Sequence, residues 1–304
     1  MSLQEFDRTE LTKLIRHAIA IKRDPEAYRA ACDRKGLLML FQKTSTRTNL
    51  SFQSGMKRMG GYTVVMNWDA SNFAVSPIKY EARYVSRGSD LIMARLKRHA
   101  DLAELAAHSA VPVINGCCDR YHPCQALADL MTVYEVSGRF EGITMTYVGI
   151  HNNVANSLAA ACMTLGVRLL LVTPVVNGPS WDDTLMQAAL RSGYVEGRSD
   201  LEEALAESDY AYTDTWVDLE FFNDPACAKE KERRLAIMLP YQLSVKSLQG
   251  RKPYIMHDMP IHPGYEIEEA LIEADHSVIY RQADNRMYAQ QALMLHLLGA
   301  AGIA

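Results

Sequence analysis

Three hydroxyl side chains and one guanidinium occupy four consecutive positions: Ser45, Thr46, Arg47 and Thr48. An apolar run typical of a buried strand, residues 36–41, precedes them, and apolar residues at helical spacing follow until Gly60-Gly61. This spacing predicts a strand-to-helix turn, where free backbone N–H groups and the positive end of the helix dipole favour an anion. We interpret the turn as a phosphate-binding site without the glycines of a nucleotide-binding loop. A plain helix cap of Ser and Thr is the alternative.

Two further polar side chains follow later apolar runs. Arg95 ends the run 90–95, and His122 stands after the run 111–115, directly before Pro123. Proline is a favoured first residue of a helix, so we expect His122 at a helix start. The helix dipole would keep the imidazole neutral there, as a hydrogen-bond donor to a carbonyl oxygen. A surface arginine and a solvated capping histidine are the alternatives for each residue taken alone.

The elements that must position these residues alternate along the chain. Strands are expected at residues 36–41, 62–68, 90–95, 111–115, 142–150, 168–174, 209–214, 254–257 and 277–280. Strands and helices in turn predict an α/β fold of two doubly wound lobes, each a parallel sheet flanked by helices. Ligands of such sheets bind at the carboxyl ends of the strands. A long helix at 122–138 is expected to connect the lobes, and a final helix at 284–299 could cross back to the first lobe.

Composition narrows the class of protein. The chain has 304 residues, 48% of them hydrophobic, and a net charge of −4, which argues against a broad nucleic-acid-binding surface. The six cysteines form no CxxC pair, as expected for reduced thiols in the cytoplasm. The N-terminal stretch carries charges among its apolar residues and predicts an amphipathic helix, so we expect neither a signal peptide nor a membrane span.

Seven segments, in order along nearly the whole chain, resemble the aspartate/ornithine carbamoyltransferase family, and its ornithine branch most closely. They are FQKTSTRTNLSF at 41–52, Arg95, His122-Pro-Cys-Gln125 with Ala126-Leu-Ala-Asp-Leu130 behind it, Asn152-Asn-Val-Ala-Asn-Ser157, Tyr212-Thr-Asp-Thr-Trp216, Met256-His-Asp-Met-Pro260 and Gln282-Ala-Asp-Asn-Arg286. The family transfers the carbamoyl group of carbamoyl phosphate to an amine and releases phosphate. The resemblance therefore implies an enzyme of amino-acid metabolism.

The resemblance also implies a division of the chain and an assembly. Residues 1–135 would bind carbamoyl phosphate, with the C-terminal helix 284–304 packing back on them, and residues 136–283 would bind the amine. In the family, the loop equivalent to residues 69–79 enters the active site of a neighbouring subunit, so a homotrimer with shared active sites is expected. An ordinary surface loop is the alternative, because this segment departs from the usual family pattern.

The roles of individual residues follow from the same resemblance. Ser45, Thr46, Arg47 and Thr48 would hold the phosphoryl oxygens, while Arg95, His122 and Thr48 would converge on the carbamoyl oxygen. Gln125 would hold the carbamoyl amino group, Arg286 would reach back to the same oxygens, and Met259 would complete this site. The amine would meet Asn153, Asp214, Asp218, Leu219 and Asp258. We expect no metal and no cofactor. No protein base is evident in the sequence, so the leaving phosphate itself would take the proton of the amine.

Several positions depart from the family pattern. Asn49 stands where a second arginine is usual, Asp218 and Glu220 replace part of a Ser-Met-Gly segment, and Asp258 replaces a cysteine. The added carboxylates suit a substrate with an extra cationic end, such as a diamine or a modified basic amino acid, and favour it slightly over ornithine. Alternatively, Asp218 and Glu220 face solvent and ornithine is the acceptor. Aspartate is disfavoured, because acidic groups oppose a dicarboxylate.

Other functions are less consistent with the sequence. A dinucleotide-dependent oxidoreductase needs a GxGxxG fingerprint and a nucleotide triphosphatase needs GxxxxGK[ST], and the sequence contains neither. A metal hydrolase built on His257 and His262 lacks an obvious third ligand. A non-catalytic scaffold of the same family remains as an alternative, although it would have no physical reason to keep converging cations.

Overall fold

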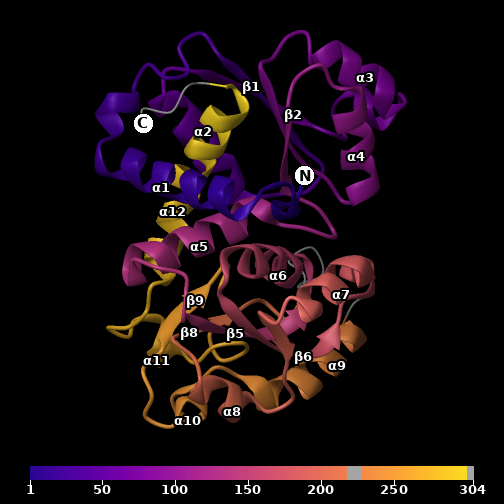
Figure 1. Cartoon of the computed structure of the whole chain (residues 1–304). Coiled ribbons are helices and arrows are strands. Elements are labelled where there is room, and N and C mark those ends of the chain that lie inside the picture. Colours follow the sequence, from indigo (N-terminus) through magenta and orange to yellow (C-terminus); the bar gives the residue numbers. More distant parts are fainter. Residues whose placement is uncertain (218–227, 300–304) are drawn as a thin grey trace. The chain divides into compact units, whose positions relative to one another are not determined.

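The structure is a computed structural model of the chain and describes residues 1–217 and 228–299 (Figure 1). The chain divides into two compact units. Unit 1 comprises Met1–Glu135 together with the chain from Asp284 onwards, and unit 2 comprises Val136–Ala283. The divisions fall near the end of helix α5 (Pro123–Ser137) and near the start of helix α12 (Ile279–Leu297).

Unit 1 contains a parallel sheet of four strands in the order β2-β1-β3-β4. Its strands are β1 (Gly36–Phe41), β2 (Tyr62–Asn67), β3 (Leu91–Arg95) and β4 (Val113–Cys117). The apolar run of β1 is buried along its whole length, as expected for a central parallel strand, whereas β2 is an edge strand and largely exposed.

The helices of unit 1 cover its sheet on both sides. They are α1 (Arg8–Arg23), α2 (Thr46–Arg58), α3 (Ile78–Val85), α4 (His99–His108), α5 and α12, with short 3₁₀ turns at Leu3–Glu5, Pro25–Tyr28 and Asn72–Ala74. Helices α1 and α2 lie on one side of the sheet and α3 and α4 on the other (Figure 1). The strand order reverses between β1 and β3, so this unit is doubly wound with its switch point there.

Unit 2 contains a parallel sheet of five strands in the order β7-β6-β5-β8-β9. The strands are β5 (Thr144–His151), β6 (Arg168–Val176), β7 (Val195–Gly197), β8 (Tyr210–Thr213) and β9 (Tyr254–His257). The helices are α6 (Asn153–Leu165), α7 (Asp183–Arg191), α8 (Leu201–Ala206), α9 (Ala228–Met238), α10 (Val245–Leu248) and α11 (Glu269–Ile272), with 3₁₀ turns at Gly178–Ser180 and Leu239–Tyr241. The chain runs from β5 outward through β6 and β7, then returns to β8 and β9. The switch point of unit 2 therefore lies between β5 and β8.

The predicted fold class is confirmed, because each unit is a parallel sheet flanked by helices. The strand expected at residues 277–280 is wrong. Ser277 forms only an isolated bridge with Ile255, and α12 already begins at Ile279. A short apolar run does not distinguish a strand from the buried first turn of a helix. In the described ranges, no helix has the length and apolar character that crossing a lipid bilayer requires.

Candidate active site

The turn after β1 lies at the switch point of unit 1. Ser45 is the N-cap of α2 and its Oγ accepts the backbone N–H of Thr48 at 3.2 Å, so the capping interpretation of Ser45 holds. Thr48 is fully buried, and its Oγ1 accepts a hydrogen bond of 3.0 Å from Nη2 of Arg286 on α12. The first turn of α2 is thereby joined to a guanidinium from the far end of the chain. A helix N-terminus with a guanidinium beside it favours a bound anion.

His122 and three arginines of unit 1 form one electrostatic cluster. His122 directly precedes α5 and is 6% exposed, and Arg286 is 3% exposed. Burial lowers the pKa of His122 well below 6.5, and the charges of Arg286, Arg95 and Arg47 lower it further. Burial and the guanidinium charges, and not the helix dipole expected from the sequence, are the main causes of the neutral imidazole. A neutral imidazole among three cations can donate a hydrogen bond to an oxygen that gains negative charge.

Two side chains of unit 1, Arg95 of this cluster and Gln125 of α5, have buried polar atoms without a hydrogen-bond partner among the described residues. Arg95 ends β3, and its Nε is buried without a hydrogen-bond partner among the described residues. Gln125 is fully buried on α5, and its Oε1 likewise has no partner within the described ranges. Buried polar atoms are normally paired, so these two atoms mark where a polar ligand would bind. They offer one donor and one acceptor to such a ligand.

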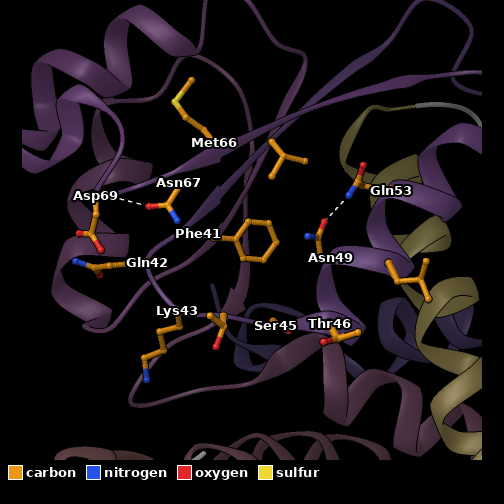
Figure 2. Close-up of a pocket in the computed structure, with 13 residues that line it drawn as sticks. Phe41, Gln42, Lys43, Ser45, Thr46, Asn49, Gln53, Met66, Asn67 and Asp69 are labelled. Carbon is orange, nitrogen blue, oxygen red and sulfur yellow. Dashed lines mark hydrogen bonds between the residues drawn. The ribbon is translucent and has the colours of Figure 1, made fainter. Parts of the chain in front are cut away.

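A cavity of about 650 Å³ opens beside the anion-binding turn, at the carboxyl ends of β1 and β2. Figure 2 shows Lys43, Ser45 and Thr46 along one side of it, and Asn49 and Gln53 of α2 facing Asn67 and Asp69. The Gln53 side-chain amide donates a hydrogen bond to Asn49 Oδ1. This volume is typical of a small-molecule site. Asn49, which stands where the family usually has a second arginine, contributes an amide to this cavity rather than a cation.

Asp214 lies at the switch point of unit 2, directly after β8, and is 4% exposed. Its Oδ2 accepts hydrogen bonds from Asn152 Nδ2 at 2.6 Å and from the Tyr147 hydroxyl at 3.3 Å. Asn152 is also the N-cap of α6, where its Oδ1 accepts the N–H groups of Val154 and Ala155. The cap fixes the orientation of the Asn152 amide, so that its NH₂ group points at Asp214.

A second carboxyl group, Asp258, lies beside Asp214. Burial raises the pKa of Asp214 well above its ordinary value, and the neighbouring charge and hydrogen bond of Asp258 raise it further. Both effects favour the protonated form of Asp214. The pair therefore carries less negative charge than two ionised carboxylates would. This weakens the argument for an extra cationic end on the substrate.

Behind Asp258, His257 connects to the buried carboxylate of Glu266. Burial lowers the pKa of His257, and the nearby carboxylates of Asp258 and Glu266 raise it. The backbone N–H of Met259 opposes a second proton, because it donates to Nδ1 at 2.8 Å and needs a lone pair there. We assign a single proton to Nε2, which lies 3.1 Å from Glu266 Oε1. This bonding fixes the backbone on both sides of Asp258.

Protein-family models match two segments of the chain. Residues 1–135 match the aspartate/ornithine carbamoyltransferase carbamoyl-P binding domain, and residues 141–297 match the Asp/Orn binding domain of the same family. The chain belongs to the aspartate/ornithine carbamoyltransferase family. Among curated relatives, ornithine carbamoyltransferase of Listeria monocytogenes is 37% identical over 99% of this chain and 95% of the relative. That of Archaeoglobus fulgidus is 35% identical over 98% of this chain and 97% of the relative.

Solved structures of the family have the same fold. Ornithine carbamoyltransferase from Pyrococcus furiosus matches with a TM-score of 0.89 and 34% identity, over 98% of this chain and 96% of that chain. The enzyme from Thermus thermophilus matches with a TM-score of 0.85 and 31% identity, over 98% and 97% of the two chains. These matches favour neither the oxidoreductase nor the scaffold alternative.

The residues named from the family pattern are distributed over both units. Unit 1 holds Ser45, Thr46, Arg47, Thr48, Arg95, His122, Gln125 and Arg286, and unit 2 holds Asn153, Asp214, Asp258 and Met259. Asn153 is the first residue of α6. Asp218 and Leu219 lie outside the described residues, as does Glu220.

Asn152 and Tyr147 were not predicted from the sequence as partners of Asp214. The two adjacent asparagines at the start of α6 were the available signal for the first, since asparagine is a favoured N-cap. A tyrosine within the buried strand β5 was the signal for the second, because a buried hydroxyl needs a partner. Neither signal identifies Asp214 as the partner.

Proposed function

We propose that the chain transfers the carbamoyl group of carbamoyl phosphate to the side-chain amine of ornithine or an ornithine-like amine, and releases phosphate. Family membership over nearly the whole chain carries this proposal. The cluster of Arg47, Arg95 and Arg286 around a neutral His122 supplies a matching chemical environment. The alternative acceptor substrates are another basic amino acid or a diamine.

In unit 1, the proposed roles follow the charge that develops during the reaction. Ser45, Thr46, Arg47 and Thr48 hold the phosphoryl oxygens, and Arg286 adds a second guanidinium beside Thr48. Gln125 holds the carbamoyl amino group, as the family pattern implies. The amine nitrogen attacks the carbamoyl carbon, whose oxygen becomes more negative and is stabilised by Arg95 and His122. The bond from this carbon to the phosphate oxygen then breaks, and its electron pair leaves with the phosphate, which also takes the proton of the amine. The protein supplies positioning and electrostatic stabilisation.

In unit 2, Asp214 is proposed to bind an amino group of the acceptor. A cationic amino group would take the place of the proton that burial and Asp258 favour on Asp214, and Asn152 and Tyr147 hold Asp214 in place for it. Asn153, Asp218, Leu219 and Met259 keep the roles that the family pattern gives them. Since the carboxyl pair is partly neutralised and the relatives are ornithine carbamoyltransferases, we now favour ornithine over a non-standard amine.

Purified protein offered carbamoyl phosphate with ornithine, putrescine, lysine or aspartate tests the reaction and the acceptor together. We expect saturable formation of citrulline from ornithine, and no reaction with aspartate because the acidic groups of unit 2 repel a dicarboxylate. Faster carbamoylation of putrescine or lysine would establish a non-standard acceptor. Transfer to none of these amines, with carbamoyl phosphate intact, would contradict the proposed function.

We also propose a cytoplasmic homotrimer with shared active sites. Unit 1 exposes several large apolar side chains on β2 and α3: Tyr62, Val64, Val65, Tyr80 and Tyr84. Apolar surface of this kind on an edge strand favours association with another chain. The five described cysteines are all free, as expected in a reducing compartment. Light scattering on protein from the cytosolic fraction should give three times the 34.1 kDa of one chain. A monomeric mass at assay concentration would contradict the trimer.

A further inference from the structure

Helix α5 presents a buried polar face to the interior of unit 1. Residues His122, Gln125 and Asp129 follow one another at spacings of three and four, so they lie on one side of the helix. Gln125 and Asp129 are both fully buried, and His122 is 6% exposed. The proposed catalytic roles use His122 and Gln125 but give no role to Asp129. A fully buried carboxyl group is costly, so its contact requires an explanation.

The contact of Asp129 fixes one end of the Gln125 amide. Gln125 Nε2 donates to Asp129 Oδ1 at 2.9 Å. A carboxylate can only accept hydrogen bonds, so it selects the NH₂ end of the amide and excludes the carbonyl end. The opposite atom, Gln125 Oε1, is left buried and without a partner among the residues that the structure describes. Asp129 therefore decides that Gln125 offers an acceptor rather than a donor.

We propose that Asp129 is a positioning residue that makes the enzyme select an acyl phosphate bearing an N–H group. The inference rests on the proposed function, in which Gln125 meets the carbamoyl amino group. A carbamoyl NH₂ satisfies Oε1, whereas the methyl group of acetyl phosphate leaves this buried acceptor unpaired. Sites built to pair with a polar group reject analogues that lack it, because the buried partner is then left unsatisfied.

Replacing Asp129 with asparagine removes this selection. The new side-chain amide can donate to Gln125 Oε1 as well as accept from Gln125 Nε2, so the Gln125 amide can also turn over and present its NH₂ group to the ligand. In the turned orientation two donors oppose each other when carbamoyl phosphate binds, while acetyl phosphate is little affected. A purely structural role for Asp129 predicts a different result, in which both acyl phosphates lose affinity together.

The test is the ratio of dissociation constants for acetyl phosphate and carbamoyl phosphate, measured by calorimetry, with inorganic phosphate as a third ligand. We expect the wild type to prefer carbamoyl phosphate by about 10- to 100-fold. Asp129→Asn should lower this ratio and leave phosphate binding unchanged. Asp101→Asn is the matched control, because it makes the same carboxyl-to-amide change at another buried position of unit 1, paired with Arg98, and should keep the wild-type ratio.

A double variant, Gln125→Glu with Asp129→Asn, exchanges the donor and the acceptor and keeps the net charge. Its asparagine can donate to one oxygen of the new carboxylate, whose other oxygen still accepts from the carbamoyl NH₂. We expect it to regain most of the preference for carbamoyl phosphate, which a structural defect would not allow. The double variant also tests the role of Asp129 if the single variant Asp129→Asn does not fold.

Three results would overturn the inference: a wild type without preference, an Asp129→Asn variant that keeps the preference, or a double variant with a ratio near unity. Turnover measured in parallel keeps the two proposals apart. A wild type that prefers carbamoyl phosphate but transfers it to no amine would contradict the proposed function and leave the role of Asp129 standing.

Discussion

Arg47→Ala is expected to lower carbamoyl transfer by about 10³-fold, the upper end of what loss of one transition-state donor usually costs. Arg47 is the second residue of α2, two positions after the capping Ser45, and its charge acts on the buried His122. The variant loses a cation and a bidentate donor at the point where the phosphoryl group is proposed to bind. Initial rates at saturating amine, over a range of carbamoyl phosphate concentrations, measure the effect.

Arg58→Ala is the matched control, because Arg58 is the last residue of the same helix and is exposed. It should retain near-wild-type turnover, since loss of an exposed positive charge at the C-terminal end of α2 weakens only a helix-dipole contribution of about 0.3–1 kcal/mol to stability. Near-normal transfer by Arg47→Ala, in protein that binds phosphate as tightly as the wild type, would remove Arg47 from the site.

His122→Ala should lower kcat by about 10²-fold, because it removes a preorganised donor to the developing oxyanion. Burial and three guanidinium charges place the pKa of His122 well below 6.5, so the wild-type imidazole stays neutral at and above this pH. The ratio of wild-type to variant kcat should therefore stay constant from about pH 6.5 to pH 8, because the proton that would change it binds only at lower pH.

His108→Ala serves as the control for His122→Ala. His108 ends α4 in the same unit, and its Nδ1 lies 3.0 Å from the backbone oxygen of Glu104, so its loss should leave kcat unchanged. Two outcomes would contradict the role of His122. One is a variant with full kcat, and the other is a wild-type to variant ratio that falls steeply as the pH drops through 6.5, since His122 would then titrate at its ordinary value.

The sequence by itself determined the fold class and the local features of the site. The apolar run of β1 and the helical spacing after Ser45 are contiguous signals, and the structure places β1 and α2 at 36–41 and 46–58. The helix start at Pro123 is equally local, because the ring of proline suits a first helical position. The strand wrongly predicted at 277–280 and the three-residue strand β7, which was not predicted, show the limit of assigning strands from the sequence. Runs this short carry too little periodicity to be assigned.

Only the tertiary structure decided the protonation and pairing of the site residues. His122 owes its lowered pKa to burial and to arginines at positions 47, 95 and 286, which come from α2, β3 and α12. Asp214 owes its raised pKa to burial and to Asp258, and its orientation to Asn152 and Tyr147. Charges interact through space and burial is a property of the packed interior, so residues far apart in the chain set these values. The sequence shows which side chains are present. Only the folded chain shows which of them are buried together, interact through their charges or form a hydrogen bond.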